Sequence, residues 1–327
     1  MSTAVDATIV IRTLNEAEWL PRVFEELKRQ AGRFSHEVVL VDSGSTDGTV
    51  EIARRHGARI VFIKKEDFSF GRSLNVGCEA AGGKVLVFVS GHCIPVGEQW
   101  LDNLIAPVME GACAYSYGRQ IGHDLTKFSE QQLFEKFFPA TSNVPNRNIF
   151  CNNANSALAR DVWAKHRFDE MLTGLEDMEL AKRLVHAGHA MGYVAEAPVI
   201  HIHDETWRRV RIRYEREAIA LQHIMPEVQV SLFDTARWFV SGVIHDLGVA
   251  IRENRLLKTW REIVMFRAMQ YWGTYQGNAL HRKISKARRE EYFYPAPRGA
   301  QAASAPAEIL PHGPSGRAAP AQLKAAA

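Results

Sequence analysis

The first 90 residues alternate short apolar runs with segments in which apolar residues recur every three or four positions. The apolar, β-branched runs predict strands at Thr8–Arg12, Glu37–Asp42, Arg59–Ile63 and Lys84–Val89. The segments between them predict helices at Glu16–Gln30, Asp47–His56 and Arg72–Ala81. Repeated strand–helix–strand units build a largely parallel sheet flanked by helices, so we expect an α/β fold.

After residue 204 the pattern becomes helical and basic. A helix predicted at Leu232–Ile251 places six apolar residues on one face: Phe233, Ala236, Val240, Val243, Leu247 and Ile251. That face either packs on the protein core, which we favour, or lies in a membrane interface beside the aromatic and Arg residues that follow. We expect an α/β domain over residues 1–224, a basic amphipathic helical extension over 225–295, and a disordered Ala/Pro-rich tail over 296–327.

The composition is that of a globular protein, with 46% hydrophobic and 24% charged residues among 327. No uncharged stretch approaches the roughly 20 residues that span a bilayer, so no transmembrane helix is expected. The N-terminus lacks a basic segment followed by an apolar run, which argues against a signal peptide and for the cytoplasm. The four cysteines have no CxxC spacing, so we expect buried, reduced thiols.

The net charge of +3 hides an asymmetry along the chain. Residues 1–204 hold 21 Lys/Arg against 26 Asp/Glu, whereas residues 205–298 hold 17 against 10. A basic segment attracts nucleic acid, phosphates or anionic lipid. Because the basic residues here accompany amphipathic helices, we favour a membrane surface, on the inner face of the plasma membrane, over nucleic acid.

Polar clusters follow three of the predicted strands: Thr13-Leu14-Asn15-Glu16, the loop Asp42 to Thr49, and Ser90-Gly91-His92-Cys93. In open parallel sheets, ligands bind beyond the carboxyl ends of the strands. We therefore expect a binding site at this edge of the sheet.

Glu176 and Asp177 open a predicted amphipathic helix directly after Thr173-Gly174-Leu175. A helix N-terminus stabilises negative charge, so we expect an ionised carboxylate that can act as a base. The alternative is an ordinary acidic first turn, as many helices have.

Together these segments resemble the inverting family-two glycosyltransferases of GT-A fold, from about Thr8 to about Ile224. The resemblance is carried by the opening strand with its Asn-Glu turn, the Asp42-Ser43-Gly44-Ser45-Thr46-Asp47-Gly48-Thr49 loop, the Phe70–Gly77 segment and Glu176-Asp177. It implies a nucleotide-diphospho-sugar transferase fold, a nucleotide-sugar donor, and a saccharide or lipid-linked saccharide acceptor, as in cell-surface polysaccharide synthesis.

The resemblance also implies roles for individual residues. Asp177 is the expected base, with Glu176 orienting substrate or its partner. Arg72 is expected to contact the diphosphate, because a guanidinium group matches phosphate geometry. Asn15 and Asp47 have a second interpretation as helix caps, which we favour for Asp47. The residues expected to bind the nucleotide-sugar are Thr13, Asn15, Glu16, Asp42, Ser43, Arg72, Asn75, Ser90, Gly91, His92 and Asn155.

One departure from the family concerns the metal. The family usually has Asp-x-Asp after the strand that ends here at Val89, whereas this chain has Ser90-Gly91-His92. Mg²⁺ prefers oxygen ligands, so the replacement weakens a simple Mg²⁺ site. Either His92 and His203 hold a divalent cation, Mn²⁺ or Mg²⁺, or His92 contacts the diphosphate directly without metal.

Two other function classes share features with this sequence. The missing Asp-x-Asp suggests a non-catalytic GT-A-like glycan-binding or scaffold protein, but a scaffold has no need of Asp177. A sugar-1-phosphate nucleotidyltransferase should carry a Gly-rich, Arg-containing loop near its start, and Thr13-Leu14-Asn15-Glu16 contains no glycine. We therefore favour the glycosyltransferase.

Overall fold

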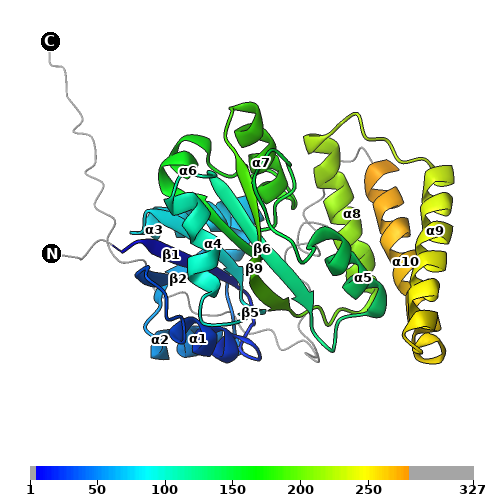
Figure 1. Cartoon of the computed structure of the whole chain (residues 1–327), viewed down its shortest axis with the longest axis horizontal. Helices are drawn as coiled ribbons and strands as arrows, with labels where there is room; N and C mark the ends of the chain where they lie inside the picture. Colours follow the sequence, from blue (N-terminus) through cyan, green and yellow to red (C-terminus); the bar gives the residue numbers. More distant parts are fainter. Residues whose placement is uncertain (1–4, 280–327) are drawn as a thin grey trace, which may run out of the picture.

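The computed structural model describes residues 5–279, which fold around a nine-stranded sheet flanked by helices (Figure 1). The strands are β1 Ala7–Thr13, β2 His36–Asp42, β3 Arg59–Phe62, β4 Val85–Ser90, β5 Cys93–Pro95, β6 Tyr115–Gly122, β7 Asn143–Asn146, β8 Asn155–Ala159 and β9 Met191–His201. Their order in the sheet is β3-β2-β1-β4-β8-β6-β9-β5, and β7 also pairs with β9.

The first four strands in this order are parallel, as the βαβ pattern predicted. Beyond them, β8 runs antiparallel to both β4 and β6, and β5 runs antiparallel to β9. The ends of β1, β2 and β4 therefore lie side by side at one edge, where Thr13, Asp42 and Ser90 follow buried strand interiors. The α/β fold class is confirmed.

Helices cover both faces of the sheet: α1 Leu20–Lys28, α2 Thr49–Arg55, α3 Phe70–Ala80, α4 Trp100–Met109, α6 Arg160–His166 and α7 Glu176–His186, with a 3-10 turn at Lys65–Asp67. Alternate side chains of β1 enter different cores. Ile9 and Ile11 pack with α1, α2 and α4, whereas Val10 packs with α3, α6 and α7. Burial on both faces explains why the strands read as continuous apolar runs.

Helix α1 begins at Leu20, four residues later than the predicted start at Glu16. Asn15 has a left-handed backbone with φ of 58°, and the hydrogen bonds of residues 15–17 go to the loop after β2 instead of a helix. Tertiary contacts therefore override the helical periodicity at this end.

A helical layer packs beside the sheet and is drawn on the right of Figure 1. It comprises α5 Phe128–Phe137, α8 Trp207–Ile224, α9 Leu232–Arg252 and α10 Leu256–Ala279. Helix α10 lies between α8 and α9 and also contacts α5. Helix α8, which we assigned to the α/β domain, thus packs along α10 of the expected extension, and the boundary at residue 224 stays a prediction.

Helix α9 keeps much of its apolar face in solvent, contrary to the core packing we favoured. Val243 and Leu247 pack against a small core around Phe128 and Ile263. Phe233 is 76% exposed, and Val240, Ile244 and Ile251 are also exposed. The helix predicted from the periodicity is present, but the protein covers only part of its apolar face.

Within residues 5–279, no helix combines the length and the apolar character needed to cross a membrane. All four cysteines are buried and unpaired, as expected. The predicted Ala/Pro-rich tail lies outside the described residues, as does the part of the predicted basic extension beyond residue 279.

Candidate active site

The loops after β1 and β2 form one hydrogen-bonded unit. The carboxylate of Asp42, which is 1% exposed, accepts hydrogen bonds from Thr13 Oγ1 at 3.1 Å and from the backbone N–H groups of Gly44 and Ser45 at 2.9 Å. Ser43 Oγ donates to the Thr13 carbonyl. Asp42 therefore shapes this loop from within.

Asn15 and Asp47 join the same two loops. Asn15 Oδ1 accepts from the Thr46 backbone N–H at 2.9 Å, and Asp47 Oδ2 accepts from the Ala17 N–H at 3.0 Å. Asp47 Oδ1 also accepts from the N–H of Thr49, the first residue of α2. Asn15 thus links the loops instead of capping α1. The N-cap position of α2 is Gly48, one residue after the Asp47 that we favoured, and Asp47 instead bonds to Thr49 from the preceding position and holds the neighbouring loop.

The turn between β4 and β5 brings His92 against the first loop. Gly91 lies so close to Glu16 that a Cβ at this position would be 2.8 Å from Glu16 Cγ, which explains the glycine. His92 Nδ1 lies 2.9 Å from Glu16 Oε1. Burial lowers the pKa of His92, but the Glu16 carboxylate outweighs it, so that the pKa lies above its ordinary value.

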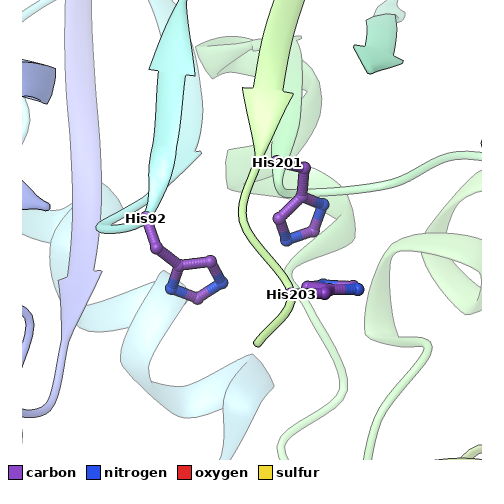
Figure 2. A group of neighbouring side chains, drawn as sticks. All are labelled: His92, His201 and His203. Atoms are coloured by element: carbon purple, nitrogen blue, oxygen red, sulfur yellow. The ribbon is translucent and has the colours of Figure 1, made fainter. Parts of the chain in front are cut away.

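Three histidines converge beside this turn (Figure 2). Strand β5 pairs with β9 so that Cys93 lies opposite His201, and the Ile202 N–H donates to the His92 carbonyl. The rings of His92 and His201 have centroids 5.3 Å apart, and those of His201 and His203 are 4.0 Å apart. Ligand atoms of all three lie within 4.8 Å of one another.

Each of the three rings uses Nδ1 toward an oxygen acceptor. His92 meets Glu16 Oε1 at 2.9 Å, His201 meets Gln120 Oε1 at 2.7 Å, and His203 meets Glu130 Oε1 at 2.6 Å. Carboxylate and amide oxygens accept, so Nδ1 donates in each case, and Nε2 keeps its lone pair in the neutral ring. Such outer partners are typical of metal-ligating histidines, whose free nitrogen they orient.

The charge around the cluster also suits a cation. Burial, and then His203 and His92, hold the pKa of His201 well below its usual value, which keeps this ring neutral and able to coordinate. Burial raises the pKa of Glu130, but Arg213 and His203 outweigh it and leave the carboxylate ionised. The donor set therefore fits a divalent metal, and it fits cations that accept imidazole better than it fits Mg²⁺.

Glu176 and Asp177 form the first turn of α7, where the sequence placed them, and both are buried. Asp177 Oδ2 accepts from the Asn153 N–H and Oδ1 from the Met178 N–H, both at 2.8 Å. Glu176 Oε1 lies 3.2 Å from the guanidinium of Arg12 at the end of β1. Residues 164 positions apart in sequence thus share one site.

We expected the helix N-terminus to keep Asp177 ionised, but the pKa of this carboxyl group is raised, not lowered. Burial and the neighbouring Glu176 raise the pKa of Asp177 to about 7, although two backbone N–H groups and Arg12 oppose the shift. Desolvation of a buried carboxylate exceeds the stabilisation that a helix end supplies. A carboxyl group with a pKa near neutrality is well matched to general-base catalysis.

A cavity of 420 Å³ connects two members of the histidine cluster with the carboxylate pair. Its wall contains Ser90, His201, His203, Glu176 and Asp177, together with residues of α5, α8 and α10. Arg12, Phe70 and Arg216 also contribute, and both guanidinium groups lie over the Phe70 ring, at 5.2 and 4.7 Å from its centroid. The candidate base and two of the three histidines therefore face one space.

Of the eleven residues expected to bind the donor, Ser90 lines the cavity. Seven others lie at the ends of β1, β2 and β4 or in the loops that follow, outside the cavity wall: Thr13, Asn15, Glu16, Asp42, Ser43, Gly91 and His92. The remaining three lie elsewhere. Asn75 is 1% exposed, and its amide bonds to Phe168, Glu170 and Trp163. Asn155 is fully buried and bonds to Trp100, Arg119 and Ala197. Both amides are buried and the fold already uses their donors and acceptors, so they have a structural role in place of the expected donor contact. Arg72 lies outside the cavity wall and contacts Glu170 at 3.5 Å.

Several residues of the site were not predicted from the sequence. Arg12 was predicted only as part of a strand. His203 was predicted as a metal ligand and His201 was not, although both occur in one His-Ile-His segment. Glu130, Arg213 and Arg216 lie on helices without a local signal. An Arg at the end of a buried strand was the one available clue, since such positions face ligands.

The βαβ sheet, the polar loops at its edge and the buried carboxylate pair across the cavity define a glycosyltransferase of GT-A fold. Residues 8–168 match the family model "Glycosyl transferase family 2", so the chain contains a family 2 glycosyltransferase domain.

Similar proteins agree with this class. The chain is 26% identical over 219 residues to the O-antigen chain rhamnosyltransferase RfbN of Salmonella typhimurium, which covers 63% of this chain and 69% of that protein. It is 26% identical over 221 residues to the succinoglycan biosynthesis protein ExoA of Rhizobium meliloti, over 61% of this chain and 64% of that one. A mannosyltransferase from Pyrobaculum calidifontis, solved with GDP-Man and Mn²⁺, shares the fold with a TM-score of 0.56 and 15% identity, over 84% and 88% of the two chains.

Proposed function

We propose that this glycosyltransferase moves a sugar from a nucleotide-sugar to a saccharide or lipid-linked saccharide acceptor, with inversion, in the synthesis of a cell-surface polysaccharide. The observation that carries the proposal is Asp177, buried in the cavity wall with a raised pKa and fixed by two backbone N–H groups. The names of RfbN and ExoA support polysaccharide synthesis.

In this mechanism the nucleotide binds the loops after β1 and β2, which Asp42 and Asn15 hold in shape. Asp177 accepts the proton of an acceptor hydroxyl, whose oxygen attacks the anomeric carbon as the bond to the diphosphate breaks. Attack from the side opposite the leaving group inverts the configuration. Glu176, paired with Arg12, keeps the guanidinium in the cavity wall.

His92, His201 and His203 would hold a divalent cation through Nε2. When bound, the cation supplies positive charge to the leaving diphosphate. Glu16, Gln120 and Glu130 orient the three rings for this role. The mannosyltransferase from Pyrobaculum calidifontis, which was solved with Mn²⁺, supports a divalent cation here.

The test is Asp177→Asn compared with Asp161→Asn, which alters an acidic first-turn residue of α6 outside the cavity. Nucleotide-sugars that raise the thermal stability of the wild-type protein identify the donor. Asp177→Asn should still bind that donor but lose transfer by at least about a hundredfold, as loss of a general base does. Transfer by Asp177→Asn at the wild-type rate would refute Asp177 as the base, whereas absence of transfer by the wild type with every nucleotide-sugar that binds would favour the non-catalytic, glycan-binding alternative.

We further propose that the protein associates with the cytoplasmic face of a membrane through α9. The exposed Phe233, Val240 and Ile244 form an apolar strip with exposed Arg237 beside it, and exposed Arg252 ends the same helix. Such a surface suits the interface of an anionic bilayer. It would bring the active site to a lipid-linked acceptor.

The membrane proposal is tested by sedimentation with vesicles that contain anionic lipid. The wild type should sediment at low salt and less at high salt, because the attraction is screened. Phe233→Glu with Ile244→Glu should abolish sedimentation, whereas Met171→Glu, at a residue that is 89% exposed on another surface, should not. Equal sedimentation of all three proteins would reject α9 as the contact.

A further inference from the structure

One wall of the cavity is aromatic and takes no part in the chemistry described above. Phe134, Phe137 and Phe138 come from α5 and its C-terminal end, and Phe150 comes from the segment before β8. The rings of Phe137 and Phe150 are stacked, with centroids 5.5 Å apart and an angle of 17° between planes. Phe137 is 46% exposed and its ring has the Lys136 ammonium 5.5 Å from its centroid, so the part of this ring that lines the cavity is open to a ligand.

The same cavity wall contains four buried polar atoms without a hydrogen-bond partner in the described part of the chain. They are Gln120 Nε2, Glu130 Oε2, Asn153 Nδ2 and Arg216 Nε. Gln120, Glu130 and Asn153 are each 2% exposed. Unpaired buried polar groups are rare in folded proteins, so four in one wall indicate a ligand that pairs with them.

Hydrogen bonds inside the protein fix the orientation of the Asn153 side chain. Its Oδ1 accepts hydrogen bonds from Tyr115 Oη and Ser156 Oγ, which fixes the amide and leaves Nδ2 as the free donor. Its backbone N–H donates to Asp177 Oδ2 at 2.8 Å. The free donor therefore belongs to the residue that holds the candidate base.

The charges of the cavity argue against an anionic occupant on this side. Arg12 is paired with Glu176 at 3.2 Å, and Arg213 is paired with Glu130 at 2.5 Å and with Glu205 at 2.8 Å. Arg216 lies 4.0 Å from Glu217, which also lines the cavity. The unpaired atoms are three donors and one acceptor. Hydroxyl groups both donate and accept, so a neutral polyhydroxylated ligand satisfies this mixture better than a phosphate does.

We propose that the aromatic wall and these unpaired atoms form the acceptor subsite and bind a neutral saccharide ring. The apolar face of the ring packs on Phe137 and Phe150, and its hydroxyls pair with Asn153 Nδ2 and Arg216 Nε. This inference rests on the proposed function, because it places the reacting hydroxyl at Asp177.

The experiment measures saccharide binding directly, without a donor sugar. Methyl α-glycosides of rhamnose, mannose, galactose and glucose are added to the full chain, and saturation-transfer NMR is recorded with and without UDP, GDP or dTDP. The variants are Phe137→Ala and Arg216→Lys, which removes Nε but keeps the charge. Matched controls are Leu125→Ala, at a residue that is 45% exposed, and Arg54→Lys on α2, both outside the cavity.

At least one glycoside should bind the wild type and the controls, and each cavity variant should weaken it by about tenfold, the size expected for one lost contact. Nucleoside diphosphates should stabilise all five proteins equally. The inference is overturned if no glycoside binds the wild type, if the cavity variants bind as tightly as the controls, or if pyrophosphate displaces the glycoside. Failure of the proposed function appears separately, as absence of nucleotide-sugar binding or as full transfer by Asp177→Asn.

Discussion

The raised pKa of Asp177 predicts that the candidate base destabilises the folded protein at the pH where it works. Burial and Glu176 raise this pKa from the ordinary 3.8 to about 7. Between these values the folded state binds a proton that the unfolded state has already released, so the free energy of unfolding falls as pH rises. A shift of roughly 3 units corresponds to at most about 4 kcal/mol, reached above pH 7.

Asp177→Asn removes this titration and should therefore gain stability relative to the wild type as pH rises. The substitution also has a constant cost, because Asn offers one acceptor oxygen where Asp177 accepts from both Asn153 and Met178. That cost is about 1–2 kcal/mol. This cost is the same at every pH, so it does not affect how the difference in stability between the two proteins changes with pH.

Urea unfolding of both proteins at pH 4.5, 6 and 8 measures this change. The stability difference should move in favour of Asp177→Asn by about 2–4 kcal/mol between pH 4.5 and 8, whereas Asp161→Asn, at an exposed residue, should show no such trend. A difference that stays constant with pH, or that moves the other way, would refute the raised pKa and with it the physical account of the base.

Other variants test the rest of the site. Glu176→Gln removes a carboxylate that raises the pKa of Asp177, and it also frees Arg12. The acid limb of the pH profile of kcat/KM should therefore move to lower pH by about one unit. An unchanged acid limb would show that Glu176 does not influence the base. His201→Ala should weaken Mn²⁺ and Co²⁺ binding, measured by calorimetry, by at least about tenfold, whereas His123→Ala, outside the three-histidine cluster, should not. Asn155→Ala removes the partner of the Trp100 N–H and one partner of each of two carbonyls, and should lower the free energy of unfolding by about 3 kcal/mol. A raised donor KM without that loss of stability would show that Asn155 contacts the donor.

The strand and helix pattern of the N-terminal half could be predicted because it depends on local periodicity. Strands β1, β2 and β4 begin and end within one residue of their predicted bounds, since a strand buried on both faces needs an unbroken apolar run. The ends were harder to predict. The start of α1 moved to Leu20 because the preceding residues bond to a distant loop, which no local pattern shows.

The site was predictable in part. Glu176 and Asp177 stand at the first turn of α7 as expected, since acidic residues before an amphipathic run indicate a helix start. Asn75 and Asn155 were placed wrongly because an amide looks the same in sequence whether it binds sugar or a backbone carbonyl. Only their burial and partners distinguish the two.

The sequence alone determined the fold class, and it predicted the edge of the sheet where a ligand would bind and the residue proposed to accept a proton, because each depends on residues close together in the chain. The tertiary structure decided which residues meet. It brought His92 to His201 through the pairing of β5 with β9, joined Arg12 to Glu176, and raised the pKa of Asp177 by burying it. Distance and desolvation arise only when the chain is folded, so they could not be predicted from residue order.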